Sequence, residues 1–174
     1  NAHAHLDRSY TVSHFDFMQK TNDHLFEKWK HVDRIKKTSG VRDYQERINH
    51  ALKKQQFFNT QSVCTFVDID PVCEHAAFIG ASFAKDDNPD IKLVIACQTL
   101  KGVLDYGPRN LLESMIDEID IVGSLPGADP GKEAEHLDVV MGWAKQTNKR
   151  LHVHVDQLNT PEEKETELLA RKTI

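Results

Sequence analysis

The sequence predicts an α/β fold in the form of a partial (β/α)8 TIM-type barrel, and three observations support this. From about residue 62, short β-branched runs alternate with amphipathic segments, which is typical of βα units around a parallel sheet. These units recur about every 30 residues, which suits a barrel or an open doubly wound sheet. No GxGxxG or Walker motif follows any run. The open sheet therefore loses its usual nucleotide-binding signature, and we favour the barrel.

Five strand positions and their connecting helices can be placed in order. The first strand would end at His3-Ala4-His5, and we expect the others at 62–70, 91–98, 119–124 and 150–156. Helical periodicity marks 25–30 and 43–55, a helical insertion after strand 1, and then 111–117 and 133–146. Thr160 as N-cap and Pro161 at the first helical position predict the start of a last helix.

A complete barrel of this type needs about 250 residues. The sequence has 174 residues, and only the first five βα units can be counted. We expect residues 1–174 to be the N-terminal part of a hydrolase barrel, a fragment from which strands 6–8 are absent. Missing sequence or another chain should then cover the open sheet edges, and a homo-oligomer is compatible with this.

Composition narrows the partners and the location. The net charge of -5 and the pI near 6.0 argue against nucleic acid and anionic membranes, because phosphate binding needs clustered Lys and Arg. No apolar run approaches the roughly 18 residues of a membrane span, and no signal segment opens the chain. We expect a cytoplasmic protein with a small-molecule substrate. Three cysteines without CxxC spacing are expected to be buried thiols.

The chemistry centres on histidines at strand ends. The two-residue spacing of His3 and His5 places both imidazoles on one face of a strand, at the carboxyl mouth of the barrel. His152 and His154 repeat this spacing on the fifth strand; we assign the ligand to His154, nearer the mouth, and expect His152 deeper in the core. Three nitrogen ligands with an open position bind one divalent ion and activate water. Zinc suits them best, with iron or manganese as alternatives.

Other polar residues have plainer interpretations. Asp68 and Asp70 could orient ligands or cap the next helix, and Asp7 with Arg8 could contact substrate or form a structural ion pair. Ser124 has no neighbouring His and Asp in sequence that would mark a triad. The remaining histidines are expected at the surface or partly buried: His14, His24, His31, His50, His75 and His136.

The run Asn1-Ala2-His3-Ala4-His5-Leu6-Asp7-Arg8 resembles the first-strand motif of the amidohydrolase superfamily, with the closest resemblance to its cytosine deaminase branch. Further support comes from 25–29, from 67–70 and from His154-Val155-Asp156-Gln157, so the resemblance spans nearly the whole chain. It implies a metal-dependent barrel that hydrolyses a C–N bond, with His3, His5 and His154 as ligands. The resemblance also implies a sixth-strand histidine and an eighth-strand aspartate, which we expect beyond Ile174.

Three positions depart from the cytosine deaminase pattern. Gln157 replaces a proton-shuttling glutamate, Gly127 replaces a glutamine that reads the pyrimidine edge, and Phe66 replaces a second-strand histidine. Cytosine itself is therefore a poor substrate candidate. No lysine ends the fourth strand as a bridge between two ions, so we expect one metal.

The resulting prediction is an amidohydrolase or deaminase that uses metal-bound hydroxide on a small nitrogenous, cyclic substrate. Gln157 is the predicted catalytic residue, and Asp7 and Gln157 are predicted to contact substrate. The alternatives are an amide hydrolase that releases no ammonia and a metal-binding barrel without turnover.

Overall fold

The computed structural model describes residues 1–11, 24–158 and 160–174, and its centre is a parallel four-stranded sheet. The strands are β1 (Ser62–Asp68), β2 (Lys92–Gln98), β3 (Ile121–Ser124) and β4 (Arg150–Val153), and they lie side by side in chain order. An open doubly wound sheet reverses its strand order at a switch point, whereas this order never reverses. The strand order therefore confirms the predicted half of a barrel.

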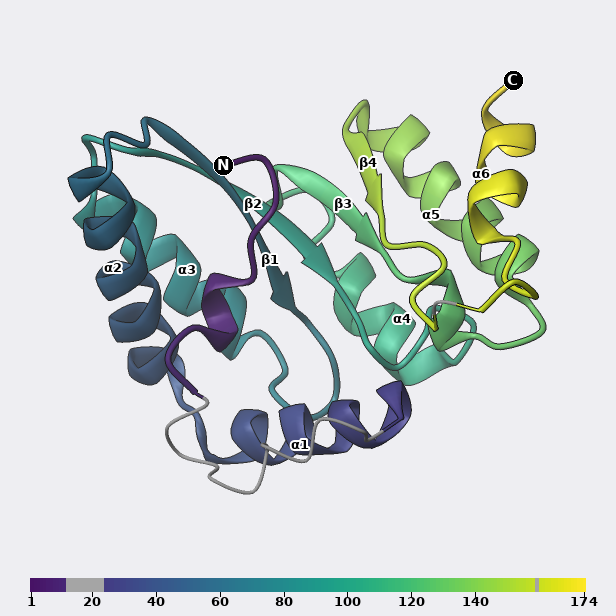
Figure 1. The fold of residues 1–174 in the computed structure, drawn as a ribbon, viewed down its shortest axis with the longest axis horizontal. Coiled ribbons are helices and arrows are strands. Elements are labelled where there is room, and N and C mark those ends of the chain that lie inside the picture. The colour runs from purple at the N-terminus through teal and green to yellow at the C-terminus, as the bar shows by residue number, and fades with distance from the viewer. Residues whose placement is uncertain (12–23, 159) are drawn as a thin grey trace.

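Helices cover one side of the sheet and close its carboxyl edge (Figure 1). They are α1 (Leu25–Thr38), α2 (Val41–Phe57), α3 (Ala76–Asp87), α4 (Tyr106–Glu113), α5 (Glu133–Thr147) and α6 (Glu165–Thr173), with 3-10 turns η1 (Leu6–Arg8) and η4 (Pro126–Ala128). Helix α3 packs on β1, β2 and α2, and α5 packs on β3 and β4. The core between them is apolar and includes Ile48, Leu52, Val63, Leu112 and Leu137, all of which are fully buried.

The predicted first strand is reduced to one bridge, in which Ala4 pairs in parallel with Thr65. The amide of Cys64 donates to the carbonyl of Asn1, and the amide of Phe66 donates to the carbonyl of Ala4. Between these two hydrogen bonds, the N-terminal segment advances by three residues while β1 advances by two. This extra residue is a bulge, which interrupts a regular ladder and re-aims side chains. The segment still occupies the first position of the sheet, beside β1, as predicted.

The last helix begins later than Thr160, and that prediction was wrong. The carboxylate of Glu163 accepts hydrogen bonds from the amides of Leu158 and Thr160, which holds a turn there. Asp156 and Glu165 then cap each other, because each carboxylate accepts the backbone N–H of the other residue. Asp156 has a positive φ of 52°, so it has left the strand in which we expected it.

Other boundaries also differ from the predicted ranges by a few residues, and α1 continues to Thr38. Helix α4 begins at Tyr106 and ends at Glu113, whereas the predicted range was 111–117. Strand β4 ends at Val153, although the amide of His154 still donates to the carbonyl of Ser124. Cys73 and Cys97 are buried thiols as expected, and Cys64 is half-buried. Within the described residues, no helix combines the length and the apolar character that crossing a membrane requires.

Helices α2 and α3 approach each other closely at Gly80. A Cβ at Gly80 would lie 2.6 Å from the Cβ of Tyr44 and 2.7 Å from the carbonyl oxygen of Val41. Gly142 in α5 has open space instead, with nothing within 4 Å of the equivalent position. Gly80 and Gly142 therefore form a matched pair for testing the contact.

We predict that Gly80→Ala lowers the free energy of unfolding by about 1–3 kcal/mol, because the methyl group overpacks the contact. Gly142→Ala should leave the free energy of unfolding unchanged or raise it by up to about 1 kcal/mol, since alanine favours helix. Urea denaturation of both variants measures the difference. Equal stabilities for the two variants would contradict the close approach of α2 and α3.

Candidate metal centre

The structure brings three histidines together from opposite ends of the chain. His3 and His5 lie on the segment beside β1, and His154 follows β4. The Nε2 atom of His154 lies 3.1 Å from the Nε2 of His5 and 3.2 Å from the Nε2 of His3. One ring nitrogen of each residue therefore points at a common position, and these are the three residues that the sequence nominates as metal ligands.

The geometry of this triplet fits a metal ion. Zinc binds imidazole nitrogen at about 2.0–2.1 Å, and tetrahedral angles then place the nitrogens about 3.3 Å apart. The observed separations are close to this value. Hydrogen bonds alone satisfy the cluster poorly, because the Nε2 of His154 can either donate or accept toward its two neighbours but cannot do both. A cation between the three lone pairs removes this conflict.

The surroundings keep the imidazoles in the neutral form that metals bind. Burial, the charge of Arg8 and the neighbouring His154 lower the pKa of His5 to about 3. Burial and the neighbouring His3 lower the pKa of His154 to about 4. Both side chains therefore keep a free lone pair at neutral pH.

Phe66 forms the apolar floor of this cluster. It is fully buried, and its ring centroid lies 4.9 Å from that of His3, 5.3 Å from His5 and 4.5 Å from His154. The resemblance implied a histidine at this position. With phenylalanine there, the floor packs against the ligands and offers no fourth nitrogen.

His152 is not the core residue that we expected. It is half-buried, and its Nε2 lies 3.2 Å from the Nδ1 of His3. Burial followed by the neighbouring His3 lowers its pKa. The alternation of His152 and His154 along the strand was the signal in the sequence that could have placed both rings at the same site.

A buried ion cluster lies where β1 ends. The carboxylate of Asp68 contacts Arg8 at 2.5 Å and Lys36 at 2.8 Å, and Lys36 also contacts Asp70. Burial would raise the pKa of Asp68, but the charges of Arg8 and Lys36 hold it well below its usual range. Asp70 also accepts the amide N–H of Val72, so it both pairs with Lys36 and caps the following turn. Lys36 ties α1 to the sheet, and nothing in its sequence context marked it.

Asp7 belongs to this cluster. It is 2% exposed and lies 3.8 Å from the guanidinium of Arg8. Burial raises its pKa to about 6, against the opposing charge of Arg8. The position favours the structural ion pair that the sequence left open, and the predicted contact of Asp7 with substrate stays a prediction.

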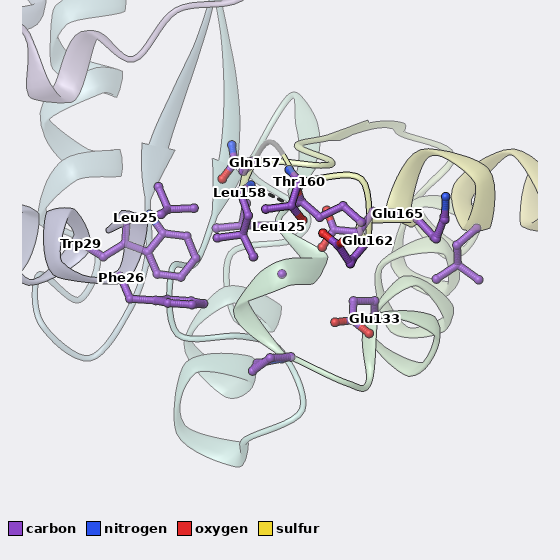
Figure 2. A pocket seen from close by; sticks show the side chains of 15 residues that line it. Leu25, Phe26, Trp29, Leu125, Glu133, Gln157, Leu158, Thr160, Glu162 and Glu165 are labelled. Carbon is purple, nitrogen blue, oxygen red and sulfur yellow. Dashed lines mark hydrogen bonds between the residues drawn. The ribbon is translucent and has the colours of Figure 1, made fainter. Parts of the chain in front are cut away.

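Gln157 lines a cavity of about 440 Å³ at the carboxyl edge of the sheet (Figure 2). Its side chain is exposed, and Leu25, Phe26 and Trp29 from the start of α1 form another wall of the cavity. Leu125 also lines the cavity. The helical insertion after the first strand therefore supplies an apolar wall opposite Gln157. The sequence identified Gln157 but not this wall, because helical periodicity does not show which face of α1 meets the sheet.

A buried Ser-His-Asp hydrogen-bond network lies beside the centre, whereas His136 was expected at the surface or partly buried. The Nε2 of His136 lies 3.0 Å from the Oγ of Ser124, and its Nδ1 lies 2.7 Å from a carboxylate oxygen of Asp129. Ser124 is 2% exposed and His136 is 1% exposed, so the hydroxyl cannot meet a substrate.

The hydrogen bonds of Ser124, His136 and Asp129 link loops at the carboxyl edge of the sheet. Asp129 also accepts the amide N–H of Val103, which joins the loop after β3 to the loop after β2. The carbonyl of Ser124 accepts the amide N–H of His154. The hydrogen bonds therefore support the backbone that carries a candidate ligand. Of the other histidines, His24 and His50 are exposed, His31 and His75 are half-buried, and His14 lies outside the described residues.

Comparisons with known proteins agree with this architecture. No protein-family model matches the sequence. A Haemophilus influenzae protein described as uncharacterized is 40% identical over 178 residues, which takes in all of this chain and 64% of that protein. Crystal structures of 5-methylcytosine deaminase from Klebsiella pneumoniae, liganded with phosphonocytosine or 5-fluorocytosine, match at TM-scores of 0.87 and 0.88 with 25% identity.

A crystal structure of N-isopropylammelide isopropylaminohydrolase from Burkholderia multivorans matches at a TM-score of 0.74 with 21% identity, which shows the fold alone. Each alignment with these solved structures covers 98% of this chain but only 42% or 43% of the matched enzyme. The chain thus spans less than half the length of the solved structures it matches. Similarity to a deaminase supports the resemblance to the amidohydrolase superfamily.

The Asp129 carboxylate gives a test of the buried hydrogen-bond chain. Burial would raise its pKa, but hydrogen bonds from His136 and from backbone amides outweigh burial and lower it. Because the folded pKa lies below the unfolded one, the ionised carboxylate stabilises the fold above about pH 4, and this stabilisation is lost as pH falls through the folded pKa.

We therefore predict that Asp129→Asn lowers the free energy of unfolding by about 1–3 kcal/mol at pH 7, and that this loss shrinks as the pH falls below about 4. Thermal unfolding of wild type and variant from pH 7 to pH 3 measures the difference. Asp138→Asn is the control, because that carboxylate is 68% exposed and its removal should cost at most about 0.5 kcal/mol at pH 7. A loss that stays constant across the pH range would contradict the role of the ionised Asp129.

Proposed function

We propose that the protein is a metal-dependent hydrolase that cleaves a C–N bond in a small nitrogenous, cyclic substrate. The observation that carries this proposal is the convergence of three imidazole Nε2 atoms at the carboxyl edge of a parallel sheet, where active sites of barrel enzymes lie. Similarity to a deaminase supports the same class of bond. The substrate of the whole protein is itself proposed, because this chain spans less than half the length of the solved enzymes that it matches.

His3, His5 and His154 are the residues that would hold the ion. When bound, a divalent ion lowers the pKa of water and polarises the carbon under attack. Three nitrogen donors favour zinc, with iron or manganese as alternatives. The protein contributes neutral imidazoles, held in place by the Phe66 floor and by the ion cluster at the end of β1.

Gln157 is the residue to which we assign substrate contact and a part in the reaction. Its side chain opens into the cavity that is lined by the start of α1. A side-chain amide can both donate and accept hydrogen bonds, which suits the ring edge or the amide of a nitrogenous substrate. It cannot act as a general acid, so it would orient the substrate rather than protonate a leaving group. This property favours an amide hydrolase that releases no ammonia as the second candidate.

The metal assignment predicts that purified full-length protein contains about one equivalent of a divalent ion. His5→Ala and His154→Ala should each lose most of it, because two remaining ligands bind weakly, while the exposed His50→Ala should keep it. Elemental analysis together with thermal unfolding separates loss of metal from loss of fold. A wild-type protein without metal, or folded His5→Ala and His154→Ala variants that keep it, would refute the proposal.

The substrate assignment predicts that the protein hydrolyses at least one member of a panel of pyrimidines, triazines and lactams. Two assays, one for released ammonia and one for ring opening, detect the reaction. Ammonia release identifies a deaminase, and hydrolysis without ammonia identifies the amide hydrolase. Metal binding without any turnover supports a non-catalytic barrel instead.

For any substrate that is found, Gln157→Ala should lower kcat/KM about tenfold to a hundredfold through the loss of a substrate hydrogen bond, with the metal content unchanged. Gln146→Ala, at an exposed position on α5, is the control and should retain full activity. Full activity in Gln157→Ala would remove Gln157 from the site.

A further inference from the structure

His152 makes a contact with the candidate metal centre that the three-ligand proposal does not use. Its Nε2 lies 3.2 Å from the Nδ1 of His3, and the two ring centroids are 5.0 Å apart at 67°. The Nδ1 of His3 is not the nitrogen that converges with the other ligands, because the Nε2 of His3 lies 3.2 Å from His154. His152 therefore contacts the outer nitrogen of a candidate ligand.

The chemistry of a metal-bound imidazole gives this contact a direction. A neutral histidine that binds an ion through Nε2 carries its proton on Nδ1, and this N–H needs an acceptor that also orients the ring. The Nε2 of His152 is placed to be that acceptor, with the proton of His152 on its own Nδ1. The hydrogen bond then runs from His3 to His152 and leaves the lone pair of His3 Nε2 facing His5 and His154.

His3 needs such support more than its two partners. It is exposed, and it lies on a segment that is joined to β1 through a single bridge and a bulge. His5 and His154 are more buried, and the backbone of His154 is also held by the carbonyl of Ser124 in β3. Their own Nδ1 atoms have no hydrogen-bond partner among the described residues. Within this part of the chain, His3 is thus the one candidate ligand whose outer nitrogen is held by another side chain.

We propose that His152 is a positioning residue of the metal centre: its Nε2 accepts the Nδ1–H of His3 and so aims His3 Nε2 at the ion. This inference rests on the proposed function, because it assumes that the three histidines bind a metal. It adds a residue whose role is to fix the tautomer and the orientation of His3, without binding the ion itself.

The test is the zinc affinity of purified full-length protein, measured by competition with a chromophoric chelator. His152→Phe keeps an aromatic ring but removes the acceptor, and it should weaken zinc binding about 10–100-fold. His152→Gln restores an acceptor oxygen, and it should recover most of the affinity. His50→Phe is the matched control at an exposed position and should bind zinc like wild type.

A double-mutant cycle assigns the effect to the contact. In a His3→Ala background, His152→Phe should cause no further loss, because the ring that it orients is gone. Equal affinity in wild type and folded His152→Phe overturns the inference but leaves the proposed function intact. Equal losses of affinity in the His152→Gln and His152→Phe variants show a packing role and also overturn the inference. The inference is overturned as well if wild type binds a second zinc that the His152→Phe variant loses. A wild-type protein that binds no zinc overturns both proposals.

A second measurement needs no variant. Nitrogen-15 NMR of the zinc-loaded protein should show His3 protonated on Nδ1 and His152 unprotonated on Nε2. The opposite pattern, with a proton on His152 Nε2, reverses the hydrogen bond and overturns the inference whatever the stability of the variants.

Discussion

The curvature of the parallel sheet is the constraint on which the histidine cluster depends. Neighbouring strands lie about 4.8 Å apart, so in a flat sheet the first segment and β4, four positions apart, would be separated by roughly 19 Å. The Nε2 atoms of His5 and His154 nevertheless lie 3.1 Å apart. The sheet must curl until side chains from its two edges meet on the concave side. Helices packed on the convex side, including α3 on β1 and β2 and α5 on β3 and β4, maintain that shape.

Charges buried at the end of β1 connect this curvature to the helical insertion. Asp68 is shared by Arg8, which follows the first two histidines, and by Lys36 of α1. Taking such charges out of water costs several kcal/mol per ion unless each has a partner, so removing one member leaves the others uncompensated. The cluster therefore holds two elements in one relative position: the segment that carries His3 and His5, and the helix whose start lines the cavity of Gln157.

Much of this fold could be predicted from residue patterns, and the exceptions have physical causes. The β-branched runs located all four strands, because a strand buried on both sides must be apolar whatever packs around it. The start of α6 was misplaced because Glu163 holds the amides of Leu158 and Thr160 in a turn and Asp156 caps the amide of Glu165, and these contacts depend on the folded loop. The metal site of the three nominated histidines could be predicted because the alternation of side chains along a strand depends only on neighbouring residues. The hydrogen bonds that link Ser124, His136 and Asp129 could not be predicted, because burial and a helix bring these residues together and their spacing in the sequence does not.

Phe66 gives the histidine cluster two unlike faces. Its ring is fully sealed from water and touches the imidazoles from below, so one hemisphere around the meeting point of the nitrogens is hydrocarbon. A benzene ring offers no lone pair, and no solvent can enter beneath it. An ion held there would exchange its remaining partners through the opposite hemisphere alone. Water and substrate would then arrive from the same direction and compete for neighbouring positions, so that the direction of approach is imposed by a side chain that takes no part in binding.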